Sequence, residues 1–173
     1  SAEMLALALG DVYTFGPTFR AENSNTSRHV AEFWMVEPEM AFCDLNENIN
    51  VAEALLKYLT EAVRQDCAED IALFAKFVDK TLLDRIDNIL TSDFERIDYG
   101  TAIQLLKESK RDFEYEVDYG KDLQSEHERY LTEVYFKKPV VVYNYPKEIK
   151  PFYMRVNDDK KTVAAMDILV PQI

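Results

Sequence analysis

Two β-rich runs separated by a short polar segment constrain the fold of this chain more than any other feature. Residues 18–22 and 30–42 are rich in aromatic and β-favouring side chains, whereas residues 23–27 are polar and turn-forming. Two extended segments joined by such a loop predict an antiparallel hairpin, residues 12–42 in all. A further β-rich run at residues 12–15 leads into the hairpin, and we expect Gly16-Pro17 to interrupt the strand between them.

Alternation along the two arms predicts a chemically distinctive face. Arg20 and Glu22 share one face of the first arm, and Phe33 and Glu37 share one face of the second. A register that joins these faces creates one surface with a guanidinium, two carboxylates and an aromatic ring. A guanidinium suits a phosphate or a carboxylate, a ring can stack on a base, and a glutamate can accept a hydrogen bond from an amine. A plainer interpretation stays open, in which Arg20 and Glu22 form an exposed ion pair and Phe33 only packs.

The rest of the chain changes period and predicts an α+β fold. Apolar residues recur every four positions over residues 51–71, which is typical of an amphipathic helix. Asn50 with Glu53 resembles a capping box and predicts the start of that helix. Strands followed by helices and then strands indicate an antiparallel β-sheet flanked by helices. We expect further helices at residues 2–9, 82–90, 101–109 and 126–135, a loop at 112–120, and strands at 140–145, 152–156 and 162–170.

Composition excludes several classes of function. The formal net charge of −12 argues against a broad basic face for nucleic acid, although a few arginines could still make a local contact. Cys43 and Cys67 have no paired spacing, and His29 and His127 are far apart, so a zinc site is not expected. The apolar run at residues 4–9 is too short for a membrane span. The opening inside a helix and the closing apolar run at residues 163–173 predict a piece of a longer chain.

Residues 18–39 closely resemble motif 2 of the class II aminoacyl-tRNA synthetases. The loop composition resembles the aspartyl, asparaginyl and lysyl subgroup, and residues 33–39 are more similar to the asparaginyl than to the aspartyl enzymes. Residues 122–133, 145–154 and 165–171 are similar to the same family, although more loosely. A match over more than twenty positions is far more specific than a short motif. The motif positions are Phe19, Arg20, Glu22, His29, Phe33 and Glu37.

The resemblance implies an ATP site on the hairpin. Arg20 would bind the α-phosphate and the amino-acid carboxylate and would be the catalytic residue. Glu22 would meet the adenine and Phe33 would stack on it. His29 would touch the terminal phosphates, with Arg28 beside it.

The resemblance also implies contacts to the other substrates. The loop residues Ser24, Asn25 and Thr26 would approach the acceptor end of tRNA(Asn). Asp167 resembles a carboxylate linked to Mg²⁺, although a carboxylate that simply faces water at a strand end is an open alternative. We expect Glu37 to accept a hydrogen bond from the side-chain amide of asparagine. Aspartate would instead bring a second negative charge beside the Glu37 carboxylate and be repelled.

The function implied by the resemblance is ATP-dependent activation of asparagine and its transfer to tRNA(Asn), in the cytoplasm, by a full-length enzyme that forms a homodimer. The chain would be one partial catalytic domain: the hairpin, a helical segment at residues 50–110, and a C-terminal helix with strands at 122–173. Motifs 1 and 3 and the anticodon-binding domain are not found, so this piece alone should be inactive. Alternatives are an aspartyl-tRNA synthetase, a synthetase-like asparagine synthetase, or a non-catalytic binding module derived from a synthetase.

Overall fold

The computed structural model describes residues 2–21 and 30–172, which fall into two compact units. The N-terminal unit comprises residues 1–44 and the C-terminal unit residues 45–173. Each unit has its own secondary structure and is taken in turn.

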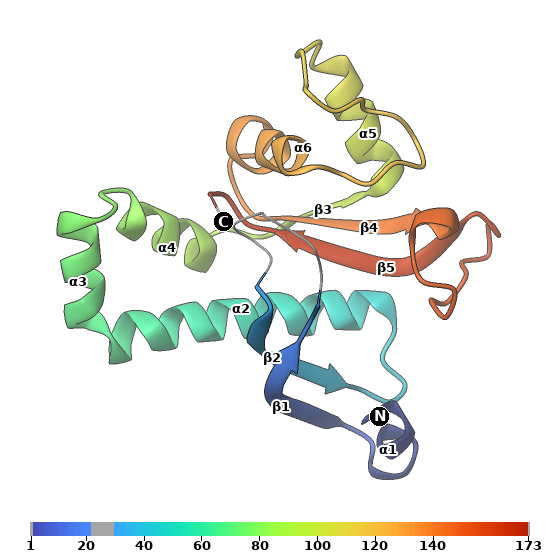
Figure 1. Ribbon diagram of the computed structural model, residues 1–173, viewed down its shortest axis with the longest axis horizontal. Coiled ribbons are helices and arrows are strands. Elements are labelled where there is room, and N and C mark those ends of the chain that lie inside the picture. Colours follow the sequence, from blue (N-terminus) through green and yellow to red (C-terminus); the bar gives the residue numbers. More distant parts are fainter. Residues whose placement is uncertain (1, 22–29, 173) are drawn as a thin grey trace. The chain divides into compact units, whose positions relative to one another are not determined.

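The N-terminal unit is a helix and a hairpin (Figure 1). After α1 (Ala2–Leu9), β1 (Val12–Phe19) pairs antiparallel with β2 (Glu32–Glu39), as the sequence predicts. The predicted interruption at Gly16-Pro17 is wrong, because β1 runs through both residues. The Arg20 N–H donates to the Ala31 carbonyl at 2.9 Å, and alternation from this bond turns the Pro17 nitrogen away from β2. A proline fits a strand at such a position because no ladder bond is lost.

The C-terminal unit contains a run of helices and a small sheet (Figure 1). Most of the expected elements are confirmed, with ends that differ by a few residues. In chain order the elements are α2 (Leu45–Asp66), α3 (Ala68–Phe77), α4 (Leu82–Thr91), β3 (Glu95–Asp98), α5 (Tyr99–Glu108), α6 (Ser125–Arg129), the π-helix η1 (Tyr130–Tyr135), β4 (Val140–Pro146), the 3₁₀ helix η2 (Lys147–Ile149) and β5 (Thr162–Leu169).

The sheet of this unit has the order β3-β4-β5 and is mixed. β4 pairs antiparallel with β5 but parallel with β3, so the α+β class is confirmed and the predicted antiparallel sheet carries one short parallel strand at its edge. The helices between β3 and β4 supply the long connection that a parallel pair requires. Within the segment at residues 50–110 that the sequence predicts to hold several helices, the structure adds the short strand β3.

Two hydrophobic clusters cover the faces of this sheet. Figure 1 shows α5 and α6 on one side of β4 and β5 and α2 on the other. Val140 and Val142 of β4 belong to the cluster that includes α5 and η1, whereas Val141 packs with Ile49 of α2 and with Phe94. All three valines are fully buried. The buried run of β4 thus reflects a strand that is covered on both faces.

Two further expectations are wrong, one at the start of α2 and one after η2. The helix begins at Leu45 and not at Asn50. The side chains of Asn50 and Glu53 do not cap a helix, because both accept hydrogen bonds from Arg96.

The predicted strand at 152–156 is absent from the described part of the chain. The Met154 N–H donates to the Pro151 carbonyl in a turn, and Val156 makes only an isolated bridge to Val163.

Candidate functional site

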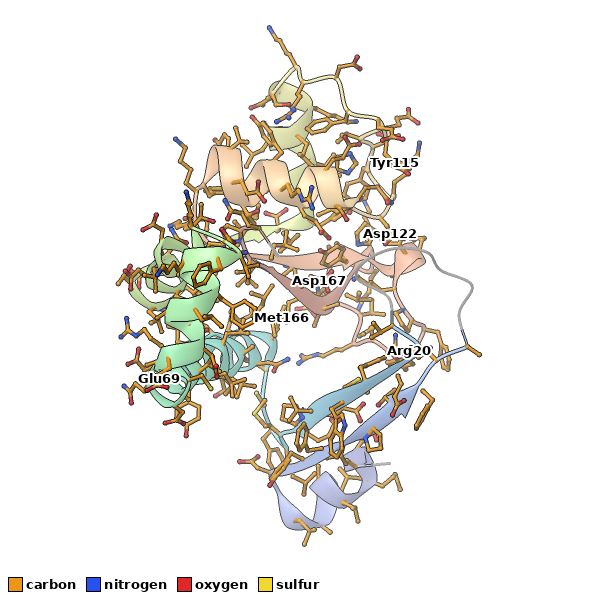
Figure 2. The ribbon with its side chains drawn as sticks, turned by 60° about the vertical axis from the view of Figure 1, so that its left-hand side comes forward. Arg20, Glu69, Tyr115, Asp122, Met166 and Asp167 are labelled. Carbon is orange, nitrogen blue, oxygen red and sulfur yellow. The ribbon has the colours of Figure 1, made fainter. Side chains whose placement is uncertain are left out.

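The hairpin register places Arg20 and Phe33 on one face of the N-terminal unit. Thr18 lies opposite Phe33 in the ladder, and Arg20 is two residues further along the same face. The Arg20 Cζ lies 5.3 Å from the centroid of the Phe33 ring, in a cation–π contact. Figure 2 shows Arg20 at the end of β1. The guanidinium is exposed, so it keeps donors for a ligand while the ring limits where it lies.

Acidic side chains occupy the other end of this face. Thr14 lies opposite Glu37, and its hydroxyl donates to Glu37 Oε2 at 3.0 Å. The pKa of Glu39 is raised, first by burial and then by the negative charges of Glu3 and Glu37. One end of the face is therefore cationic and the other anionic. A carboxylate has about four lone-pair positions, so the bond from Thr14 leaves Glu37 able to accept others.

The opposite face of the hairpin is aromatic. Phe15 and Trp34 contact each other with ring centroids 5.1 Å apart, and Tyr13 and Phe19 continue the same face. All four rings are exposed. The two faces of the hairpin thus differ sharply in chemistry, and only one of them carries the predicted ATP contacts.

Six of the predicted site residues lie between the two arms, outside the described residues. They comprise the three other predicted ATP contacts and the three predicted tRNA contacts. They are Glu22, Ser24, Asn25, Thr26, Arg28 and His29.

Asp167 lies in the C-terminal unit, on β5 opposite Val142 (Figure 2). The Lys150 Nζ donates to Asp167 Oδ2 at 3.0 Å and lies 3.9 Å from the centroid of the Tyr145 ring. Burial raises the pKa of Tyr145, and the charge of Asp167 raises it further. Asp167 is therefore part of a cluster and not a lone carboxylate at a strand end.

Sequence reasoning missed Lys150 and Tyr145 as partners of Asp167. Both lie in residues 145–154, a segment that resembles the synthetase family, and this was the available signal. Tyr145 lies on β4, the strand that pairs with β5, and Lys150 lies directly after η2.

The residues of this cluster can contribute one carboxylate to a metal. Among the described residues, no group of three or more His, Cys, Asp or Glu side chains could hold an ion by itself. Mg²⁺ commonly keeps several waters and takes one or two carboxylates together with substrate phosphates. A single carboxylate such as Asp167 is thus compatible with an ion whose other ligands are phosphates and waters.

His127 is buried and has a structural role. Its Nδ1 accepts the Gln124 N–H at 3.1 Å, and its Nε2 lies 3.1 Å from the Tyr115 carbonyl, to which it donates. The Glu126 carboxylate accepts from the Tyr115 N–H at 2.7 Å. The side chains of Glu126 and His127 thereby fix the loop that carries Tyr115. Figure 2 shows Tyr115 above the sheet.

A cavity of about 310 Å³ opens between α4, η1 and the segment after β5, and Asp167 does not line it. The Arg85 guanidinium donates to the Gln172 carbonyl at 3.0 Å, and the Asn88 amide donates to the Lys137 carbonyl at 3.1 Å. These bonds tie its walls together.

In the part of the chain that the structure describes, no helix is long and apolar enough to cross a membrane.

The family model for the class II tRNA synthetases (D, K and N) matches residues 2–173. The chain belongs to this family. It is 64% identical over 172 residues to the asparagine–tRNA ligase of Oleidesulfovibrio alaskensis, covering 99% of this chain and 37% of that protein. It is 60% identical over 173 residues to the ligase of Myxococcus xanthus, covering 100% of this chain and 37% of that protein. The chain therefore spans little more than a third of the length of these relatives.

Solved structures of this synthetase family have the same fold. The asparaginyl-tRNA synthetase from Pyrococcus horikoshii complexed with asparaginyl-adenylate matches with a TM-score of 0.85 and 36% identity, over 98% of this chain and 37% of that one. The aspartyl-tRNA synthetase from Entamoeba histolytica matches with a TM-score of 0.77 and 24% identity, over 97% of this chain and 34% of that one. The second likeness shows the fold alone.

Proposed function

We propose that this chain is part of the catalytic domain of an asparagine–tRNA ligase. In this function asparagine reacts with ATP to give asparaginyl-adenylate, and the amino acid then passes to tRNA(Asn). The observation that carries the proposal is the pairing of the Arg20 guanidinium with the Phe33 ring on one hairpin face. The relatives at 60% identity or more are asparagine–tRNA ligases, which supports asparagine over aspartate.

The first step needs positioning and charge neutralisation more than proton transfer. The asparagine carboxylate attacks the α-phosphorus in line, a new C–O–P bond forms, and pyrophosphate leaves with the electron pair of the broken P–O bond. Arg20 would hold the α-phosphate and the attacking carboxylate together with its planar fork. Phe33 would stack on the adenine and fix the nucleotide relative to that fork. Aligning the two reactants in this way supplies much of the rate enhancement.

Charge develops on the phosphates as pyrophosphate leaves. Fixed positive groups aimed at that charge lower the barrier. Arg28 and His29, which lie beyond the described residues, are proposed to contact the phosphates together with Arg20, and Glu22 to meet the adenine. Asp167 is proposed to hold Mg²⁺, which would supply further positive charge to the phosphates.

Glu37 is proposed to select asparagine by its side-chain amide. The carboxylate lies on the face that carries Arg20, and the Thr14 hydroxyl holds its Oε2. An amide N–H can donate to this carboxylate, whereas the aspartate carboxylate would repel it.

The second step transfers the amino acid to the 3′ end of tRNA(Asn). Ser24, Asn25 and Thr26 of the hairpin loop are proposed to approach the acceptor end. We place this activity in the cytoplasm, in a homodimer of a full-length ligase, with residues 1–173 forming one partial catalytic domain.

Asparagine-dependent ATP–pyrophosphate exchange tests the proposal in a full-length ligase that contains these 173 residues. We expect exchange with asparagine and little with aspartate. The 173-residue chain alone should give negligible exchange. Exchange that prefers aspartate, or none in the full-length protein, would contradict the proposed function.

Selectivity is tested in the same protein with Glu37→Gln. We expect the ratio of kcat/KM for asparagine over aspartate to fall by about tenfold or more, because loss of the repulsive charge removes a penalty against aspartate. Glu32→Gln is the matched control, since Glu32 lies on the opposite face of β2. An unchanged ratio in Glu37→Gln would remove Glu37 from the proposal and leave the activity standing.

A further inference from the structure

The carboxylate proposed to receive Mg²⁺ is already paired with a cation from its own unit. The Lys150 Nζ lies 3.0 Å from Asp167 Oδ2. The Lys150 side chain is 19% exposed and the Asp167 side chain is 48% exposed, so the lysine is the more buried of the two. Two cations at one carboxylate repel each other, and a divalent ion bound to Asp167 has to compete with this ammonium.

Lys150 has a second partner that does not depend on Asp167. Its Nζ lies 3.9 Å from the centroid of the Tyr145 ring. That ring is 3% exposed and packs against Tyr99 at a centroid distance of 5.2 Å, so it is fixed in the core. A cation–π contact is stronger when it is shielded from water. The ammonium therefore keeps a favourable position when the carboxylate binds another cation.

A nearby lysine has a different environment. The Lys147 Nζ donates to the Lys160 carbonyl at 3.1 Å and is exposed. Lys150 instead joins the turn after η2 to the middle of β5 across seventeen positions of the chain. The ion pair thus orients a side chain at the proposed metal position, which a surface lysine such as Lys147 does not do.

We infer that Lys150 is a positioning residue that acts as an internal counter-cation for Asp167. It holds the carboxylate in place before ATP arrives, and the divalent ion that accompanies ATP takes its place while the ammonium remains on the Tyr145 ring. The inference rests on the proposed function, which supplies the metal and the nucleotide. Its consequence is that Asp167 binds a metal weakly until phosphates add their own ligands.

The test measures Mn²⁺ binding to the full-length ligase with ATP and without asparagine, by electron paramagnetic resonance of free Mn²⁺. Lys150→Met removes the competing charge and keeps a chain that can pack on the ring. We expect its Mn²⁺ affinity to rise about three- to fivefold, which is the scale of a partly exposed ion pair. Lys150→Arg should keep the original affinity, and Lys147→Met is the matched control. Unchanged or weaker binding in Lys150→Met would overturn the inference.

A double variant shows whether the effect passes through Asp167. In an Asp167→Asn background, Lys150→Met should change the Mn²⁺ affinity no further. A gain that persists in this background would mean that Lys150 acts on another group, and the inference would be wrong.

A measurement on the unsubstituted ligase covers the case in which a variant does not fold. With lysines labelled with ¹³C at the ε-carbon, Mg²⁺ added with ATP should shift the Lys150 resonance and leave that of Lys147 in place. Absence of a shift at Lys150 would overturn the inference. Failure of asparagine-dependent exchange would instead contradict the proposed function. Normal exchange together with an unaltered Mn²⁺ affinity in Lys150→Met would contradict only the role of Lys150.

Discussion

The two units of this chain differ in how they use their side chains. In the C-terminal unit, two hydrophobic clusters sandwich the sheet, and β4 contributes three fully buried valines. In the N-terminal unit, the described hairpin contributes to neither cluster, and its strands carry side chains on two exposed or half-exposed faces. The proposed contacts to ATP and asparagine lie on the hairpin. Substitutions in the two units should therefore separate loss of activity from loss of stability.

The largest effect is expected at Arg20. Arg20→Met should lower asparagine-dependent exchange in the full-length ligase by about 10²–10³-fold, because a charged donor to the α-phosphate is lost. The free energy of unfolding should change by less than about 0.5 kcal/mol, as for an exposed side chain. Arg64→Met on α2 is the control for loss of an exposed arginine, and its exchange should stay near normal. Near-normal exchange in Arg20→Met would contradict the placement of the ATP contacts on the hairpin.

The opposite behaviour is expected in the core of the C-terminal unit. Leu106 of α5 is 1% exposed and lies in the larger cluster. Leu106→Ala should lower the free energy of unfolding by about 3 kcal/mol, because it leaves a cavity. Urea unfolding followed by circular dichroism measures this, with the exposed Leu83→Ala as control. A cost below that of Leu83→Ala would mean that the cluster does not carry the stability of this unit.

The two faces of the hairpin can be compared directly through adjacent rings. Phe33→Ala should raise the KM for ATP about tenfold, since stacking on a base contributes about 1–3 kcal/mol. Trp34→Ala removes a ring from the opposite face and should leave the KM for ATP nearly unchanged. Equal increases in the KM for ATP from the two substitutions would show that ATP does not bind specifically to the face that carries Phe33.

The smallest effect concerns the pH dependence of the C-terminal unit. Burial opposes ionisation of Asp98, but hydrogen bonds from Thr101 outweigh it and hold the pKa of Asp98 below its ordinary value. The stabilisation is complete above the ordinary pKa and is lost as the pH falls through the lowered one. Asp98→Ala should therefore cost about 1 kcal/mol at neutral pH, as for loss of a helix N-cap, and less in strong acid.

Urea unfolding at the two pH values measures this difference, with Asp98→Asn as the control. Asparagine can still cap α5 but does not titrate, so this variant should lose less stability at neutral pH and show no pH dependence from this position. A cost of Asp98→Ala that does not shrink in acid would assign the effect to packing.

The parts of the fold that were predictable are those with a strong local signal. The hairpin, α4, α5 and β5 follow from alternation, from period and from turn residues. β3 was missed because Glu95–Asp98 has four residues inside a helical region, and only its pairing with β4 makes it a strand. The start of α2 was misplaced because Asn50 and Glu53 bind Arg96, more than forty positions away.

The candidate site shows the same division. The common face of Arg20 and Phe33 follows from alternation once the two arms pair, and the structure has this register. The link from Lys150 to Asp167 could not be predicted in the same way, because residues 152–156 had the composition of a strand. The structure instead has a turn at Pro151, and the chain reverses into β5 at residues 157–162.

The hydrogen bonds of His127 limit what its substitution can reveal. Because Nδ1 accepts from the Gln124 N–H, the neutral ring must carry its proton on Nε2, where the Tyr115 carbonyl receives it. Both ring nitrogens are thus engaged with backbone groups, so the imidazole holds the adjoining loop in place. An inactive His127→Ala enzyme would therefore report a misplaced loop and not the loss of acid–base chemistry.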